Sequence, residues 1–315
     1  MQIDFATPLL MRLLIGLAAS ALIGAFALWR GSLTPSGAWG AVIVGTTLFG
    51  FGGWAAGLTL IAFFASSSLL SHFKENNARK QRAAEMFEKG GQRDIWQALA
   101  NGGAAAIFAV VYGLIPLFDP QYLMVDAPLL GYLLVSSQAA MLGALATVNA
   151  DTWATELGVL NKSNPRLITT FKTVAPGTSG AITLFGCLAA CAGAMFVSLL
   201  YVELLNIESF PLQQAMSINT SFALLWETLS SSVEGLLIFT MAGLLGSLFD
   251  SFLGATVQAM YYCDARQKET EKAIERDGTP NRHLRGWKWM NNDWVNFISS
   301  LFGALVAVML STVIF

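Results

Sequence analysis

The chain has 315 residues, of which 55% are hydrophobic and only 12% are charged. Soluble domains carry about 25% charged residues, so a soluble fold of this size would have too few charges to cover its surface. The composition also excludes an intrinsically disordered chain, and a net charge of −2 gives no basic footprint for nucleic acid. Three cysteines and two histidines argue against a disulfide framework, zinc catalysis and a Ser-His-Asp triad. We therefore expect an integral membrane protein.

Apolar segments long enough to cross a bilayer recur along the whole chain. A spanning helix needs about 20 mostly apolar residues. This criterion predicts spans near residues 8–29, 39–70, 102–117, 129–148, 180–206, 233–258 and 296–315. The second region is too long for one simple span and contains Gly50, Gly52 and Gly53, so it is either one broken helix or two short helices. We expect an all-α helical bundle forming a single transmembrane domain over residues 1–315, with seven spans favoured and eight as the alternative.

Lysine and arginine residues are distributed unequally between the connecting segments. Sixteen of the 18 lie in three segments, 71–100, 149–179 and 259–295, and the long connections between them contain none. The positive-inside rule places these three segments in the cytoplasm or an equivalent compartment, where they form the polar site. The C-terminus then lies outside, whereas the N-terminus lies inside with seven spans and outside with eight. Within the third segment, the mixed-charge stretch 266–280 is predicted to form a solvated helix.

Carboxylates at the cytoplasmic ends of two spans are the first candidates for a functional site. Polar groups in or beside membrane spans are costly, so each needs a structural or functional reason. Asp151 and Glu156 follow the fourth predicted span and, being five positions apart, would diverge by about 140° on a continuous helix. Asp250 lies in the otherwise apolar sixth span, and Gln258 falls on the same helical stripe. We expect Asp250 in particular to have a function.

Groups suited to phosphate binding occur at the same membrane face. Lys172 precedes a turn that contains Gly177, and Thr178 or Ser179 can cap the fifth span, whose helix N-terminus offers free N–H groups. The third, fifth and seventh spans all begin at this face, so three positive helix ends point toward it. Further polar residues at this face are Lys74, Asn77, Asn101, Asn292 and Asp293. Each motif alone also fits an ordinary cap or turn, but their convergence indicates a divalent cation and phosphate groups.

Several of these motifs together resemble a known family. The blocks are 63–74, Ala-Asp151-Thr-Trp-Ala-Thr-Glu156-Leu-Gly, Pro165-Arg-Leu-Ile-Thr-Thr, Pro176-Gly-Thr-Ser-Gly180, 248–258 and Asn291-Asn-Asp293-Trp-Val-Asn-Phe. They are similar, in order from about residue 38 to the C-terminus, to the transmembrane protein 19-like family (domain of unknown function 92), which includes the plant phytyl-phosphate kinase. The resemblance implies transfer of phosphate from a nucleoside triphosphate to an isoprenyl monophosphate. Related phytol and dolichol kinases use CTP, which favours CTP as donor.

The roles of individual residues follow from their chemistry. We expect Asp151 and Asp250, with Asp293 as a third ligand, to hold Mg²⁺, which bridges transferring phosphates. Glu156 is expected to orient the acceptor or to bind the metal through water, and Lys172 to neutralise phosphate charge. The predicted substrate-binding residues are Lys74, Asn77, Asn101, Gly177, Thr178, Ser179, Gln258 and Asn292.

Two other classes of function are compatible with the same residues. A transporter or flippase for a lipid phosphate or small anion would also use an intramembrane carboxylate. A membrane scaffold would tolerate substitution of the inner carboxylates. In the kinase hypothesis the isoprenyl tail lies between spans, in contact with membrane lipid. The sequence favours no particular prenyl chain length or oligomeric state.

Overall fold

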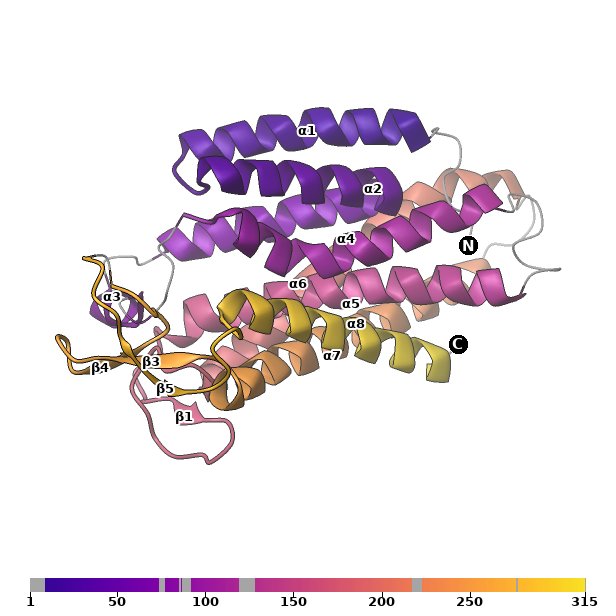
Figure 1. Cartoon of the computed structure of the whole chain (residues 1–315). Helices are drawn as coiled ribbons and strands as arrows, with labels where there is room; N and C mark the ends of the chain where they lie inside the picture. The colour runs from indigo at the N-terminus through magenta and orange to yellow at the C-terminus, as the bar shows by residue number, and fades with distance from the viewer. Residues whose placement is uncertain are drawn as a thin grey trace.

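A computed structural model of the chain describes residues 9–73, 77–84, 86, 92–118, 128–216, 223–275 and 277–314. Its long helices run side by side and form one elongated bundle (Figure 1). The helices are α1 (Leu9–Trp29), α2 (Pro35–His72), α3 (Ala78–Ala84), α4 (Ile95–Phe118), α5 (Pro128–Gly158), α6 (Leu184–Met216), α7 (Ala223–Thr256) and α8 (Asn292–Ile314). Among the described residues, seven helices are long and apolar enough to cross a membrane, as the sequence predicts. The protein is therefore a multi-pass helical membrane protein.

Helix α2 is a helical hairpin that reverses direction at Gly53. This residue has φ 83° and ψ −176°, which lies outside the helical region and which glycine adopts without a steric penalty. A Cβ on Gly45 would lie 3.9 Å from the side chain of Leu60. Fifteen residues of continuous helix would separate the same two residues by about 22 Å. The two halves of α2 therefore lie side by side, as Figure 1 shows.

The hairpin raises the number of passes along the bundle to eight. Helix α4 runs parallel to the first half of α2, because Gly40 lies against Ala98 near the start of both helices and Gly113 lies against Phe51 near their ends. The second half of α2 must then return to the end of the bundle where α4 begins. As a result α1 begins and α8 ends at the same end of the molecule (Figure 1). The eight-pass alternative of the sequence analysis is the arrangement that the structure adopts.

Helix α5 is the central helix of the bundle. Its residues 137–150 are all buried, and it packs against α2, α4, α6, α7 and α8. The helices approach closely through small residues: the side chain of Thr147 occupies the space that a Cβ on Gly246 of α7 or on Gly303 of α8 would need. This contact fixes the position of the next turn of α5, which carries Asp151.

Two small antiparallel sheets cover one end of the bundle. One pairs β1 (Arg166–Leu167) with β2 (Ala181–Ile182), and the other has the order β4-β3-β5, formed by Lys268–Thr270, Met260–Cys263 and Arg282–Arg285. The prediction of a helix over 266–280 is therefore wrong. Positive φ angles at Gln267 and Gly278 turn the chain, and Lys268–Thr270 pairs with the tyrosine-rich strand before it.

Several helices extend further toward this end than hydropathy predicts. Helix α4 already begins at Ile95, α5 continues to Gly158 and α8 begins at Asn292, so parts of the three predicted loop segments are helical. Hydropathy does not detect these terminal helical turns because their side chains are polar, although their backbone hydrogen bonds are helical. At the start of α4, for example, Asp94 and Gln97 form a reciprocal capping box.

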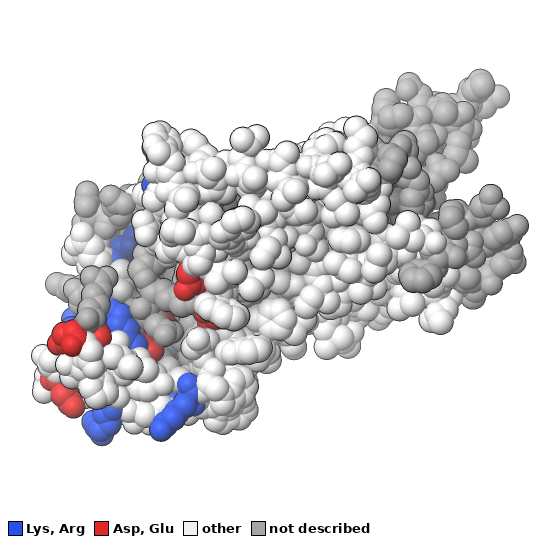
Figure 2. All heavy atoms as spheres, turned by 45° about the horizontal axis from the view of Figure 1, so that its top comes forward, with Lys and Arg blue, Asp and Glu red and all other residues white. Residues whose placement is uncertain are grey.

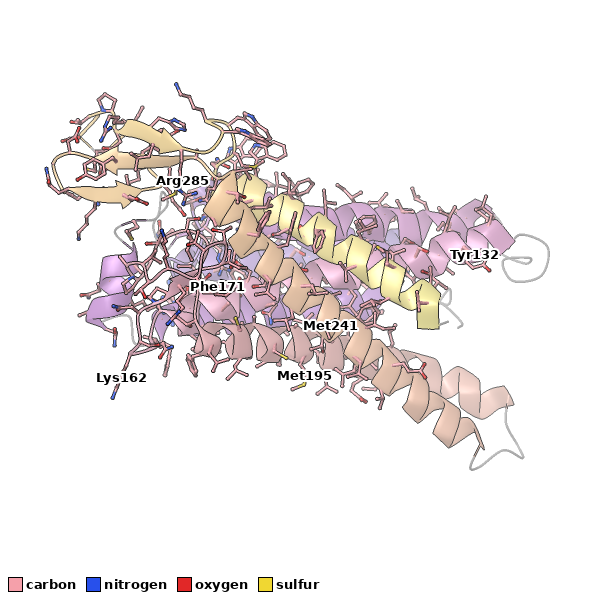
Figure 3. The ribbon with its side chains drawn as sticks, turned by 90° about the horizontal axis from the view of Figure 1, so that it is seen from below. Tyr132, Lys162, Phe171, Met195, Met241 and Arg285 are labelled. Atoms are coloured by element: carbon pink, nitrogen blue, oxygen red, sulfur yellow. The ribbon has the colours of Figure 1, made fainter. Side chains whose placement is uncertain are left out.

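The end that carries the sheets has the features of a membrane interface rich in basic residues. Apart from Arg12, every described lysine and arginine lies there, and charged side chains gather at this end in Figure 2. Lys162 and Arg285 lie at this end, whereas Tyr132 lies near the opposite one (Figure 3). Tryptophans prefer membrane interfaces, and six of the seven exposed tryptophans among the described residues lie at this end, at positions 29, 39, 96, 287, 289 and 294. We refer to this end of the bundle, which carries the two sheets, as the basic end.

We predict that both chain termini lie on the opposite side of the membrane from the basic end. In sealed cells, tags on either terminus should be accessible from outside. A cysteine replacing Arg30 in the connection between α1 and α2, or Lys268 in β4, should be protected from an impermeant maleimide. A single-pass α2 would instead expose the Arg30→Cys position, so strong external labelling there would contradict the hairpin.

Candidate functional site

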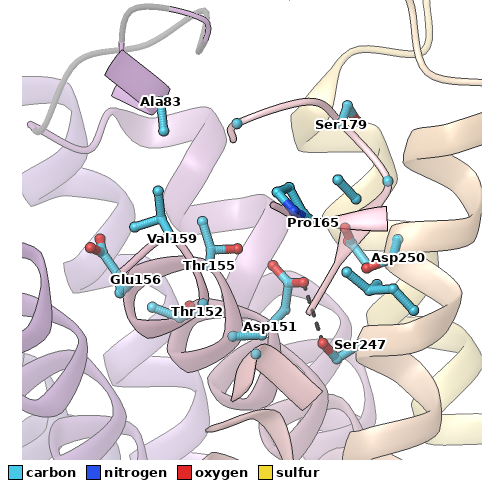
Figure 4. Close-up of a pocket in the computed structure, with 18 of the residues that line it drawn as sticks. Ala83, Asp151, Thr152, Thr155, Glu156, Val159, Pro165, Ser179, Ser247 and Asp250 are labelled. Carbon is cyan, nitrogen blue, oxygen red and sulfur yellow. Dashed lines mark hydrogen bonds between the residues drawn. The ribbon is translucent and has the colours of Figure 1, made fainter. Parts of the chain in front are cut away.

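A cavity of about 460 Å³ opens at the basic end, between the inner ends of α5, α6, α7 and α8. Helix α3 and the loop 176–180 form part of its wall. Figure 2 shows acidic side chains inside a hollow at this end, and Figure 4 shows the wall in close-up. The sequence-predicted site residues that line the cavity are Asp151, Glu156, Gly177, Thr178, Ser179, Asp250, Gln258, Asn292 and Asp293. The structure thus brings together motifs more than 100 residues apart.

Two carboxylates face each other across this cavity. Asp151 projects from α5 and Asp250 from α7, and both point toward the same space (Figure 4). Ser247 donates a hydrogen bond to Oδ1 of Asp151 at 3.4 Å, and Ser299 of α8 donates to Oδ2 of Asp250 at 2.8 Å. Neither carboxylate forms an ion pair with a described lysine or arginine. Their mutual repulsion at the inner end of the bundle would be offset by a bound cation.

The donor set fits Mg²⁺ accompanied by phosphate rather than a complete protein cage. Within the described part of the chain, no three Asp, Glu, His or Cys side chains cluster closely enough to hold a metal ion. Asp293 lines the cavity from the first turn of α8 without completing such a cluster. Mg²⁺ is usually bound by one or two carboxylates together with substrate phosphates and water. Asp151 and Asp250 could therefore hold Mg²⁺ that also binds phosphate.

Glu156 has a different set of partners from those predicted. It points away from Asp151 on α5 (Figure 4), and Ser71 donates to its Oε1 at 2.6 Å. Lys80 of α3 lies 2.6 Å from its Oε2 and also donates to the carbonyl oxygens of Leu70, Ser71 and Phe73 at the end of α2. Both carboxylate oxygens are thus engaged. The geometry gives Glu156 the role of fastening α3 to α2 and α5 at the cavity wall.

The N-terminus of α6 opens onto the cavity, but its cap differs from the prediction. The helix begins at Leu184, and Thr183 caps it by accepting a hydrogen bond from the N–H of Gly186 at 2.9 Å. The expectation that Thr178 or Ser179 caps this helix is wrong, because the short strand β2 separates these residues from it. Helices α4 and α8 also begin at this end of the bundle, as the sequence predicts, and Gln97 of α4 and Asn292 of α8 line the cavity.

The loop 176–180 is held between α3 and α7 by two glycines. Gly177 (φ 89°) lies against Ala83, and Gly180 (φ 78°) lies against Ala255, so both the backbone angle and the close approach require glycine. Ser179 donates to Oε1 of Gln258 at 2.5 Å. Within the described structure, the N–H groups of Ser179 and Gly180 donate to no protein acceptor. These two backbone N–H groups are therefore available to donate hydrogen bonds to phosphate oxygens.

The remaining predicted residues that the structure describes do not line the cavity. Lys74 lies outside the described residues. Lys172 is exposed beyond the end of β1, and Asn77 lies before α3. Asn101 lies behind the cavity wall, where it accepts a hydrogen bond from Nδ2 of Asn296 at 3.1 Å.

Arg93 is a basic residue of the cavity wall to which the sequence analysis gave no role. Its backbone pairs with the connection between α1 and α2, through hydrogen bonds with Ser32 and Thr34. Its guanidinium lies over the ring of Phe64, 5.9 Å from the centroid, and has no hydrogen-bond acceptor among the described residues. Burial lowers the pKa of Arg93 and the charge of Glu156 opposes this effect, but an arginine remains cationic in either case. The feature of the sequence that could have identified Arg93 is its position directly before Asp94, the residue that caps α4.

Comparison with known proteins places this chain in a family. The family model described as integral membrane protein DUF92 matches residues 18–304. The chain is 33% identical to Protein PGR of Arabidopsis thaliana over 96% of this chain and 98% of that protein. It is 27% identical to an uncharacterized membrane protein of Methanocaldococcus jannaschii (88% of this chain, 85% of that protein) and 25% identical to Protein VTE6, chloroplastic, of Arabidopsis thaliana (88% and 65%). No solved structure matches the chain significantly.

We predict that Glu156→Gln loosens the wall of the cavity. The substitution removes the negative charge beside Lys80 while leaving an oxygen that accepts from Ser71, and hydrogen bonds to charged groups are worth about 1.5–3 kcal/mol. Thermal unfolding in detergent should therefore shift downward, and protease cleavage between residues 73 and 94 should accelerate. The control Glu269→Gln alters an exposed residue of β4 and should change neither measurement. Unchanged protease sensitivity in Glu156→Gln would contradict this role.

Proposed function

Because the chain belongs to the DUF92 family of integral membrane proteins, we propose that it is a membrane kinase acting on an isoprenyl monophosphate. The donor is a nucleoside triphosphate, with CTP favoured, and the acceptor is of the phytyl or geranylgeranyl phosphate type. The observation that carries the proposal is the pair Asp151 and Asp250, which no described basic residue neutralises, in a cavity at the end of the bundle where α4, α6 and α8 begin. The family resemblance supports the choice of acceptor.

The cavity offers separate groups for metal and for phosphate. Asp151 and Asp250 would supply hard oxygen ligands for Mg²⁺, and Asp293 lines the same cavity. When bound, Mg²⁺ neutralises the charge that accumulates on the phosphates during transfer. In this proposal Arg93 and the N–H groups of Ser179 and Gly180 bind phosphate oxygens, and the positive ends of α6 and α8 add a favourable field.

The proposed reaction requires positioning more than acid–base chemistry. An oxygen of the prenyl phosphate attacks the terminal phosphorus of the nucleotide, and the bond from that phosphorus to the bridging oxygen breaks. The products are the prenyl diphosphate and a nucleoside diphosphate. The acceptor oxygen is already ionised at neutral pH, so no side chain needs to remove a proton. The protein must hold two anions in line and stabilise the charge between them, which suits this cavity.

We predict that Asp250→Asn and Asp151→Asn each reduce turnover by about 100- to 1,000-fold, the usual effect of losing one electrostatic contact in the transition state. The assay is formation of labelled diphosphate from geranylgeranyl phosphate, Mg²⁺ and CTP by purified protein. The control Asp264→Asn removes a carboxylate from the exposed turn after β3 and should retain full activity.

The same assay separates the kinase from a transporter. Absence of diphosphate formation by the wild-type protein with CTP, ATP, GTP and UTP would overturn the proposed function. Uptake or flipping of lipid phosphate into proteoliposomes in that case would favour the transporter hypothesis. Wild-type activity in Asp250→Asn would remove this residue from the site.

We further predict that Mg²⁺ stabilises the protein through the same two carboxylates. A ligand present at 100 times its Kd adds about 2.7 kcal/mol to the free energy of unfolding. The melting temperature of the wild type in detergent should therefore rise with Mg²⁺ in the presence of a non-hydrolysable nucleotide. This rise should be absent in Asp151→Asn and Asp250→Asn and retained in Asp264→Asn. An equal rise in all four proteins would place the metal elsewhere.

A further inference from the structure

We infer that the isoprenyl tail of the acceptor enters an apolar crevice between α1, the α2 hairpin and α4; this inference rests on the proposed function. The crevice has a volume of about 90 Å³ and lies next to the polar cavity. Residues of α1, both halves of α2 and α4 line it, among them Ala19, Ile23, Val44, Gly45, Leu60 and Ile61. Apart from its inner end, its wall is almost entirely aliphatic, aromatic or glycine.

The crevice and the polar cavity share part of their walls. Arg93 and Gln97 line both spaces. One turn further along α4, Asn101 lines the crevice and accepts a hydrogen bond from Asn296, which lines the cavity. A cation and two amides thus mark the boundary between a polar and an apolar compartment. A molecule with an anionic head and a branched apolar tail would place its head in the polar cavity and its tail in the apolar crevice.

The crevice exists because α2 folds back on itself. The reversal at Gly53 places Gly45 and Leu60 on facing halves of the hairpin, and the absence of a Cβ at Gly45 lets Ser20 of α1 pack closely against it. Helix α1 packs on the outside of this hairpin at the edge of the bundle (Figure 1). A volume of about 90 Å³ is on the scale of a single five-carbon unit rather than a whole tail. The rest of the tail then continues past α1 into the lipid.

Photo-crosslinking in nanodiscs tests this inference without relying on turnover. The probe is geranylgeranyl phosphate with a diazirine on the isoprene unit next to the phosphate, and mass spectrometry locates the adducts. We expect adducts on α1, α2 and α4 residues of the crevice, suppressed by excess unlabelled geranylgeranyl phosphate. Ala19→Leu fills the crevice and should reduce the adduct yield by about five-fold or more. Ala21→Leu adds the same side chain to the exposed face of α1 and should leave the yield unchanged.

The outcomes separate the tail site from the kinase. Competed adducts in the crevice of a protein that forms no diphosphate would support the tail site and overturn the proposed reaction. Diphosphate formation with adducts elsewhere would overturn the tail site alone. Crevice adducts that phosphatidic acid suppresses as well as geranylgeranyl phosphate would show a general lipid site and overturn the inference. The wild-type adduct map decides the question even where Ala19→Leu does not fold.

Discussion

The close contact of three helices around Thr147 determines the geometry of the rest of the site. Gly246 of α7 and Gly303 of α8 both meet the side chain of this threonine, so no Cβ separates either helix from α5. One helical turn toward the basic end, each helix then presents a polar residue at the same level. These residues are Asp151, Asp250 and Ser299, and Ser299 donates to Asp250. Small-residue packing in the apolar core thus positions two carboxylates at the edge of the membrane.

The electrostatic character of the cavity follows from the direction of the helices around it. Helices α4, α6 and α8 begin there, and their N-terminal N–H groups favour anions. Helices α5 and α7 end there and contribute the two aspartates. Glu156 differs from these two aspartates because Lys80 and Ser71 each contact one of its oxygens. The cavity therefore combines anion-binding helix ends with a carboxylate pair, an arrangement that suits metal-bound phosphates.

Nine of the thirteen residues that the sequence assigned to the candidate site line the cavity. Intramembrane carboxylates such as Asp250 are costly, and the positive-inside rule places their helix ends at one membrane face. The membrane class, the basic end and the location of Asp151, Gly177, Asp250 and Asp293 along the chain were determined in this way. Local features such as these depend on composition and spacing, which the sequence states directly.

Other features were decided only by the tertiary structure. The reversal at Gly53 depends on the packing of two half-helices against α1 and α4, because Gly50 and Gly52 are equally permissive in the sequence. Arg93 and Lys80 reach the cavity and Lys172 does not, because contacts between helices far apart in sequence decide which side chains line it. Thr183, rather than Thr178 or Ser179, caps α6, because β2 pairs with β1 and the helix therefore begins only after β2. The relative positions of helices and strands that lie far apart in the chain cannot be predicted from local composition and spacing.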